Sequence, residues 1–163
     1  DAAAVLLAAD RPGLAKSFIT FRIEVGERDE HDPEELGGAY LAFLEACSAA
    51  QDSEAGLKFA TEARLDSLSE ELRPVASMLI GDLALGTGET TDLDRAEREY
   101  QSVVKESDEP EYRAEALAML VEVYDRMDQR DLVTKTNAQF ESELANINPE
   151  LAEELQDRVS QFL

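Results

Sequence analysis

The sequence contains one cysteine, one histidine and no tryptophan in 163 residues, and each scarcity removes a class of structure or chemistry. With Cys47 alone, no disulfide can form within the chain. Aromatic residues make up only 6%, and the 44% of hydrophobic residues are mostly alanine and leucine, which favours closely packed helices over an all-β fold. No apolar run reaches the length of a membrane span, so we expect no direct membrane contact from this sequence.

Positive charge is also scarce. The chain has 15 basic residues against 37 acidic ones, a formal net charge of -22 and a pI near 4.2. Such a chain repels phosphate groups, so nucleic acid is not an expected partner, whereas a basic or amphipathic protein or peptide is. Only four of the basic residues are lysines, and adaptation to high salt would explain the same acidity. The sequence leaves both explanations open.

The residue types that usually catalyse reactions or bind metals are present, but they are not arranged as a catalytic or metal site requires. His31 lies in an acidic stretch, but there is no second histidine or nearby cysteine to complete a metal site, so we interpret the stretch as a solvated loop. Cys47 falls where related segments have Leu83 and Tyr124, which predicts a buried, inert thiol. The segment Gly86-Thr87-Gly88 lacks the lysine of a phosphate-binding loop. We therefore expect no catalytic residue, no metal, no cofactor and no enzymatic activity.

A helical segment recurs roughly every 36 to 41 residues, at 41–51, 77–87 and 118–128. Apolar residues fall at equivalent places in the three copies: Phe43, Leu79 and Leu120, followed by Cys47, Leu83 and Tyr124. A period in this range is typical of stacked helical repeats, because one helix pair cannot bury its own apolar face. The repeat therefore predicts an all-α fold.

Prolines followed by acidic residues mark helix starts at Pro33, Pro110 and Pro149, and Ser69 with its following acids marks another. Together with the 3.6-residue periodicity, these marks predict nine helices: 2–9, 12–26, 33–51, 54–67, 70–86, 92–106, 110–128, 131–146 and 149–162. We interpret residues 1–163 as a single domain. It comprises an incomplete N-terminal unit (1–32), hairpins at 33–69, 70–109 and 110–148, and a capping helix at 149–163.

The second helix of each hairpin is expected to pack through a small residue followed by larger ones. The sets are Gly56, Ala60 and Ala63; Ala96, Tyr100 and Val103; and Thr136, Phe140 and Leu144. The stretch 18–25 is also compatible with an alternating strand, but Leu14, Phe18, Phe21 and Val25 lie at helical spacing, so we interpret it as the second helix of the incomplete first unit.

These features resemble a degenerate, bacterial type of tetratricopeptide repeat (TPR), most clearly over residues 70–163. The segment 117–128 is similar to the first helix of the family, with Leu120 and Tyr124 on its packing face and Asp128-Gln129 at its turn. Residues 92–104 are similar to the second helix. No copy has the initial tryptophan of the family, and Thr136 replaces its alanine. The resemblance implies a right-handed solenoid of antiparallel helix hairpins.

The resemblance also implies a binding groove lined by the first helix of each hairpin. Carried onto this chain, the groove residues are Gly38, Leu41, Glu45, Ser48 and Ala49, then Ser77, Gly81, Ala84 and Leu85, then Glu115, Ala118, Glu122, Asp125 and Arg126. An apolar floor with an acidic end suits a basic, amphipathic helix or peptide. An alternative is that residues 2–9 of the chain fill part of this floor. If the groove is open, Leu41→Glu and Leu85→Glu are expected to weaken binding with little loss of stability.

We therefore expect a protein-interaction scaffold or assembly adaptor. Two alternatives remain. The first is self-association, as a homodimer formed through exposed leucine or phenylalanine side chains at either end of the array, including Phe162 and Leu163. The second is a non-catalytic, regulatory part of a larger enzyme or cell-envelope complex.

Overall fold

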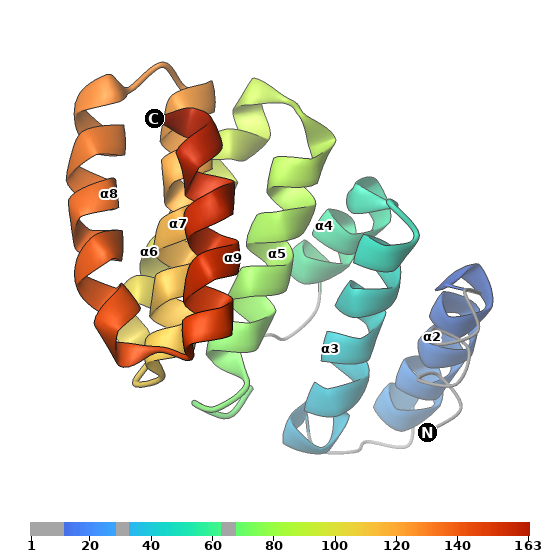
Figure 1. Cartoon of the computed structure of the whole chain (residues 1–163). Helices are drawn as coiled ribbons and strands as arrows, with labels where there is room; N and C mark the ends of the chain where they lie inside the picture. The colour runs from blue at the N-terminus through green and yellow to red at the C-terminus, as the bar shows by residue number, and fades with distance from the viewer. Residues whose placement is uncertain (1–11, 29–32, 63–67) are drawn as a thin grey trace. The chain divides into compact units, whose positions relative to one another are not determined.

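The structure, a computed structural model, describes residues 12–28, 33–62 and 68–163, and all regular secondary structure among them is helical. The elements are α2 (Pro12–Arg28), α3 (Pro33–Ala49), α4 (Ser53–Glu62), α5 (Arg73–Thr87), α6 (Thr90–Glu106), α7 (Pro110–Arg126), α8 (Arg130–Glu143), α9 (Pro149–Val159) and two short 3-10 helices, η2 (Leu144–Asn146) and η3 (Ser160–Phe162) (Figure 1). The predicted all-α class is confirmed for these residues. The predicted helix at 2–9 lies outside them.

The helix starts predicted at prolines are confirmed at Pro33, Pro110 and Pro149. Asn148 caps α9, since its side-chain oxygen accepts a hydrogen bond of 2.8 Å from the backbone N–H of Glu150. The start predicted at residue 70 is wrong by three residues. There the backbone carbonyl of Ser69 accepts hydrogen bonds from the N–H groups of Leu72 and Arg73, and α5 begins only after this turn.

The chain divides into two compact units, Asp1–Thr87 and Gly88–Leu163. The sequence predicted a single domain, and the boundary falls inside its predicted hairpin 70–109, in the loop between α5 and α6. Gly88 in this loop has a φ of 72°, a left-handed conformation that glycine adopts without the strain of a side chain.

In the first unit, α3 packs against α2, α4 and α5, and α4 packs against α5. Gly56 makes the close approach of α4 possible, because a Cβ atom there would lie 2.6 Å from Cδ1 of Leu83 on α5 and 3.1 Å from Cβ of Cys47 on α3. The ring of Phe59 on α4 contacts the rings of Tyr40 and Phe43 on α3, with centroids 5.7 and 4.4 Å apart. The small residue predicted on the inner face of α4 therefore has the role that the sequence assigned to it.

The helix predicted from the spacing of apolar residues at 12–26 is confirmed as α2, but most of the residues that indicated it are not its packing residues. Ala15, Ile19 and Ile23 are the buried residues of this helix, whereas Leu14, Phe18 and Phe21 are 54%, 37% and 63% exposed and Val25 is half-buried. Apolar residues cover about half of the circumference of α2, so two different faces satisfy the helical period equally well. In the structure α2 packs against α3, and the face with Ala15, Ile19 and Ile23 is the buried one.

In the second unit, α7 is the central helix and contacts α6, α8 and α9 (Figure 1). Every residue from Ala116 to Tyr124 is buried, so this part of α7 is covered on all sides. The predicted inner faces of its neighbours are confirmed, since Ala96, Tyr100 and Val103 of α6 and Thr136 and Phe140 of α8 are all buried. Only Leu144, which lies in η2 rather than in α8, is half-buried.

The turns that end α3 and α7 have the same backbone geometry. Gln51 and Asp128 have φ angles of 54° and 56°, and the N–H groups of the next residues, Asp52 and Gln129, reach back to the carbonyls of Cys47 and Tyr124 at 2.9 Å. This is a Schellman turn with a left-handed residue after the helix. Gln51 and Asp128 also occupy equivalent places in the sequence repeat, so the repeat extends to the backbone of the turns.

Candidate partner-binding surface

The predicted groove residues of α3 are the most accessible set. Gly38, Glu45, Ser48 and Ala49 are all exposed, and their spacing places them along one side of the helix. We call these four residues the open strip of α3. The fifth residue of the set, Leu41, is 8% exposed and belongs to the core.

The predicted groove residues of α5 are largely inaccessible. Gly81, Ala84 and Leu85 are buried, and Ser77 is half-buried. The expectation that Leu41→Glu and Leu85→Glu spare the stability of the protein is therefore wrong, because both leucines are core residues. The sequence could not distinguish a groove lined with small residues from a helix packed closely through them.

The predicted groove residues of α7 form part of an ionic cluster. Ala118 and Glu122 are buried, Glu115 and Asp125 are half-buried, and Arg126 is exposed. The two carboxylate oxygens of Glu122 accept hydrogen bonds from different arginines, Oε1 from Nη2 of Arg126 at 2.5 Å and Oε2 from Nη2 of Arg158 at 2.9 Å. Arg158 belongs to α9, so the C-terminal helix reaches a residue that was predicted to face a partner.

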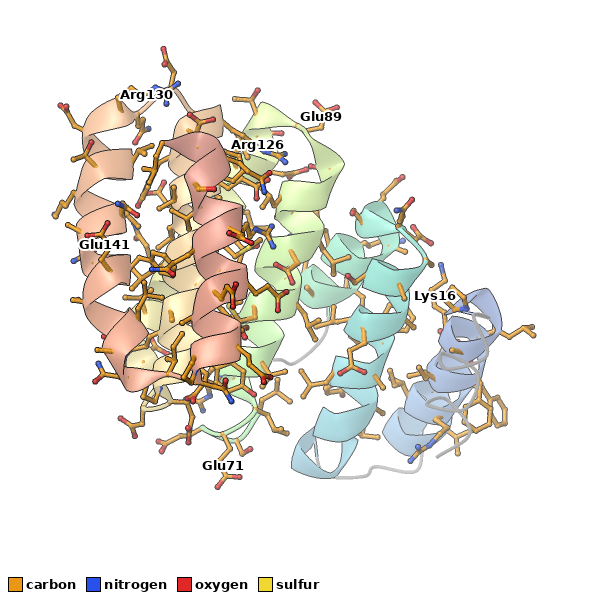
Figure 2. All side chains as sticks on the ribbon, viewed as in Figure 1. Lys16, Glu71, Glu89, Arg126, Arg130 and Glu141 are labelled. Carbon is orange, nitrogen blue, oxygen red and sulfur yellow. The ribbon has the colours of Figure 1, made fainter. Side chains whose placement is uncertain are left out.

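Figure 2 shows Arg126 and Arg130 at the end of the second unit where α7 passes into α8. Arg130 lies 2.7 Å from the carboxylate of Asp125, another predicted groove residue. The acidic end of the predicted groove is thus partly neutralised by arginines of the same chain. Arg158 was not among the predicted site residues, although it is the one basic residue of the predicted capping helix 149–163.

Two further polar contacts fix α7 to its neighbours. The hydroxyl of Tyr124 donates to Glu97 of α6 at 3.0 Å and accepts from Nε2 of Gln101 at 2.9 Å. Burial, together with the hydrogen bond to Glu97, raises the pKa of Tyr124 above its usual value. The guanidinium of Arg113 donates to both carboxylate oxygens of Glu143, through Nε at 3.4 Å and Nη2 at 3.2 Å.

Cys47 is buried, as the sequence predicts, and burial raises the pKa of its thiol to about 11. The nearby ion pair of Lys16 and Asp52 acts on the thiol in opposite directions, since Lys16 lowers its pKa and Asp52 raises it. The thiol is therefore protonated at neutral pH, which is not the state of a nucleophilic cysteine. Lys16 is labelled on α2 in Figure 2.

Within residues 12–28, 33–62 and 68–163, no group of three or more histidine, cysteine, aspartate or glutamate side chains is placed to hold a metal ion. His31 lies outside these ranges. None of the helices described in the structure combines the length and the apolar composition needed to cross a membrane.

The exposed apolar residues of α2 are the surface feature that the sequence analysis missed. Leu14, Phe18 and Phe21 lie three to four residues apart, so they share one face of the helix. Leu163, which was predicted as an exposed end residue, is 69% exposed, whereas Phe162 is half-buried. The signal for the α2 face was present in the sequence, because its apolar residues are too numerous for one packing face.

No family matches. Neither a protein-family model nor a curated protein nor a solved structure is significantly similar to this chain. Function must therefore be argued from the arrangement of the side chains.

Proposed function

We propose that the protein is an interaction scaffold with TPR-like helix hairpins, which binds a basic, amphipathic segment of a partner protein. The observation that carries this proposal is the open strip of α3. This helix packs against α2, α4 and α5, yet Gly38, Glu45, Ser48 and Ala49 stay exposed along one side. Gly38 has no side chain and those of Ser48 and Ala49 are very small, so a partner helix or strand can bring its backbone close to α3.

Charge supports a basic partner. Glu45 is the one ionisable residue in the open strip, and the chain as a whole carries a net charge of -22. A field of this sign attracts lysine- and arginine-rich segments and increases their association rate at low ionic strength. A partner residue that pairs with Glu45 would sit beside the small side chains of the strip, where apolar residues of the same partner can be buried.

The second unit supports the proposal indirectly. There, α9 packs against α7, buries Leu155 and Val159, and places Arg158 on the carboxylate of Glu122. Within the chain itself, α7 thus already binds an amphipathic helix that carries one arginine, namely α9. We infer that the partner of the open strip has the same pattern, with apolar anchors and an arginine or lysine beside them.

The experiment is a pull-down with the purified protein at several salt concentrations, in which two surface variants are compared with matched controls. Glu45→Arg reverses the charge of the open strip, and Ser48→Trp fills it. Glu106→Arg on α6 and Ala138→Trp on α8 introduce the same two side chains at exposed positions elsewhere. The proposal requires a partner that is captured in a salt-sensitive manner by the wild type and by both controls, and that both strip variants lose. If no partner behaves in this way, the proposal is wrong.

A further inference from the structure

Three of the four large apolar residues that are exposed in the described part of the chain lie on α2. Leu14, Phe18 and Phe21 are 54%, 37% and 63% exposed, although α2 packs against α3. They occupy positions i, i+4 and i+7 of the helix, so they share one side of it, which we call the α2 face. This is the spacing with which an amphipathic helix places its anchors in the groove of a partner. Large apolar side chains gathered on one exposed face indicate an interaction surface.

The charge of α2 also differs from that of the rest of the chain. The helix contains three basic and two acidic residues, which gives a formal net charge of +1. Every other helix that the structure describes has a formal net charge of zero or below. Arg22 is exposed and directly follows Phe21, so a positive charge borders the α2 face. This helix therefore has apolar anchors with an arginine beside them, the pattern inferred above for the partner of the open strip.

The open strip of α3 has the complementary features. Gly38, Ser48 and Ala49 leave room for large side chains of a partner, and Glu45 lies between them along the helix. The whole of α3 contains three glutamates and no basic residue. At about 1.5 Å per residue, the strip extends over about 16 Å and the three anchors of α2 over about 10 Å. The strip is thus long enough to receive all three anchors.

We propose, on the basis of the function proposed above, that the α2 face of one copy of the chain binds the open strip of a second copy, whose α2 face binds the strip of the first in return. Within one molecule, α2 and α3 pack against each other while both surfaces stay exposed, so neither surface covers the other. Exchange about a two-fold axis closes a dimer and buries both surfaces of each copy. A foreign basic peptide would cover only the strip and leave the α2 face in water.

The net charge of -22 on each copy does not prevent this contact. At an ionic strength of about 0.15 M the Debye length is about 8 Å, so charges on distant parts of the two copies are largely screened from each other. Charges close to the contact have the largest effect, and there Arg22 of one copy is expected to lie beside Glu45 of the other. Because of the two-fold symmetry, each dimer contains this pair twice.

The test is a charge exchange between two variants of the full chain, measured by light scattering over a range of concentrations. Arg22→Glu and Glu45→Arg each place like charges in both contacts of their own dimer, so each is expected to weaken the wild-type dimer about tenfold or more. In a mixture of the two variants, both contacts of the mixed dimer join opposite charges again, and association is expected to return to about the wild-type level. Glu106→Arg is the matched control, because it makes the same charge change at an exposed position of α6 and should leave the dimer intact.

Phe21→Asp tests the apolar part of the contact and is expected to make the protein monomeric. Leu163→Asp, its control at another exposed apolar residue, should not. A wild type that stays monomeric up to about 1 mM would overturn this inference but not the proposed function, because the open strip can still capture a foreign partner. A dimer that survives Glu45→Arg, or a mixture that associates no better than either variant alone, would also overturn it. The proposed function fails separately, if the strip variants lose no partner in the pull-down.

Discussion

Glu45 and Glu122 occupy equivalent places in the two units, six residues before the left-handed turn residues Gln51 and Asp128. Their surroundings nevertheless differ. Glu45 is exposed on the open strip of α3, whereas Glu122 is 6% exposed and accepts hydrogen bonds from two arginines. The residue four positions further along explains part of this difference, because it is Ala49 in the first unit and Arg126 in the second.

The two units therefore use the same helix and turn in different ways. In the first unit, α4 packs closely at Gly56 and through the ring of Phe59, Lys16 of α2 pairs with Asp52, and one side of α3 stays accessible. In the second unit, side-chain hydrogen bonds join α7 to α6, α8 and α9, and every residue of α7 from Ala116 to Tyr124 is buried. The proposed binding surface accordingly belongs to the first unit.

The largest expected effect comes from placing a carboxylate in the core of either unit. Leu41→Glu and Ala118→Glu alter equivalent positions that are 8% and 0% exposed. Each is expected to reduce the free energy of unfolding by about 3 kcal/mol or more, because the new charge is buried without a partner. Chemical denaturation would measure this. A small loss at Leu41 alone would show that the accessible surface of α3 extends further than the open strip.

The second prediction concerns the two glutamates themselves. Glu122→Ala is expected to cost about 1–2 kcal/mol, a discounted value because both arginines are about half exposed and regain water when the carboxylate is removed. Glu45→Ala is expected to change stability by less than about 0.5 kcal/mol. Thermal and denaturant unfolding of the two variants would check this. Equal losses would contradict the distinction drawn between the two helices.

Much of the helical framework could be predicted from the sequence, because prolines, caps and apolar periodicity are local signals. The starts at Pro33, Pro110 and Pro149 and the packing residues Ala96, Tyr100 and Phe140 depend on neighbours within a few positions. The division into two units could not be predicted in this way. It depends on which helices pack most closely, and the loop around Gly88 looked only like a long connection within one hairpin.

The candidate surface was harder to predict than the fold, because small side chains have two opposite uses. Gly38 and Ala49 are exposed, whereas Gly81 and Ala84 are buried, although all four belong to the same predicted set. A small residue lets a neighbouring helix approach whether that helix comes from the same chain or from a partner. Only the positions of the surrounding helices decide between the two.

The third prediction tests whether the turns after α3 and α7 are as alike as their backbones indicate. Gln51→Gly and Asp128→Gly each remove a side chain from a left-handed residue, and each is expected to raise the stability by about 0.5–1 kcal/mol. The gains should be nearly equal in the two units. Gly88→Ala is the converse control and should destabilise the protein, because its φ of 72° is unfavourable for alanine. Opposite signs at Gln51 and Asp128 would mean that the two turns carry different strain.

The smallest expected effect is electrostatic and concerns Asp52, which accepts hydrogen bonds from Lys16 and from the backbone N–H of Ala55 and so caps α4. The Lys16 hydrogen bond, followed by that of Ala55, lowers the pKa of Asp52, and the hydrogen bond to Asp52 raises the pKa of Lys16. Asp52→Asn keeps a capping oxygen and loses only this partly exposed ion pair, at a cost of about 0.5 kcal/mol. Asp52→Ala loses both, at about 1 kcal/mol or more.

The pH dependence follows from these directions. The lowered pKa of Asp52 means that its contribution to the free energy of unfolding is present above the unfolded pKa of about 3.9. This contribution is lost as the pH falls through the folded pKa. The raised pKa of Lys16 means that its contribution to the free energy of unfolding is present below the unfolded pKa of about 10.4. This contribution is lost as the pH rises through the folded pKa. The stability difference between the wild type and Asp52→Asn should thus be constant from about pH 5 to 9 and vanish in strong acid. In the second unit, Asn148 caps α9 without a charge. Asn148→Ala should therefore cause the same loss of stability at every pH in that range. A loss that varies with pH would show that a charged group contributes to this cap as well.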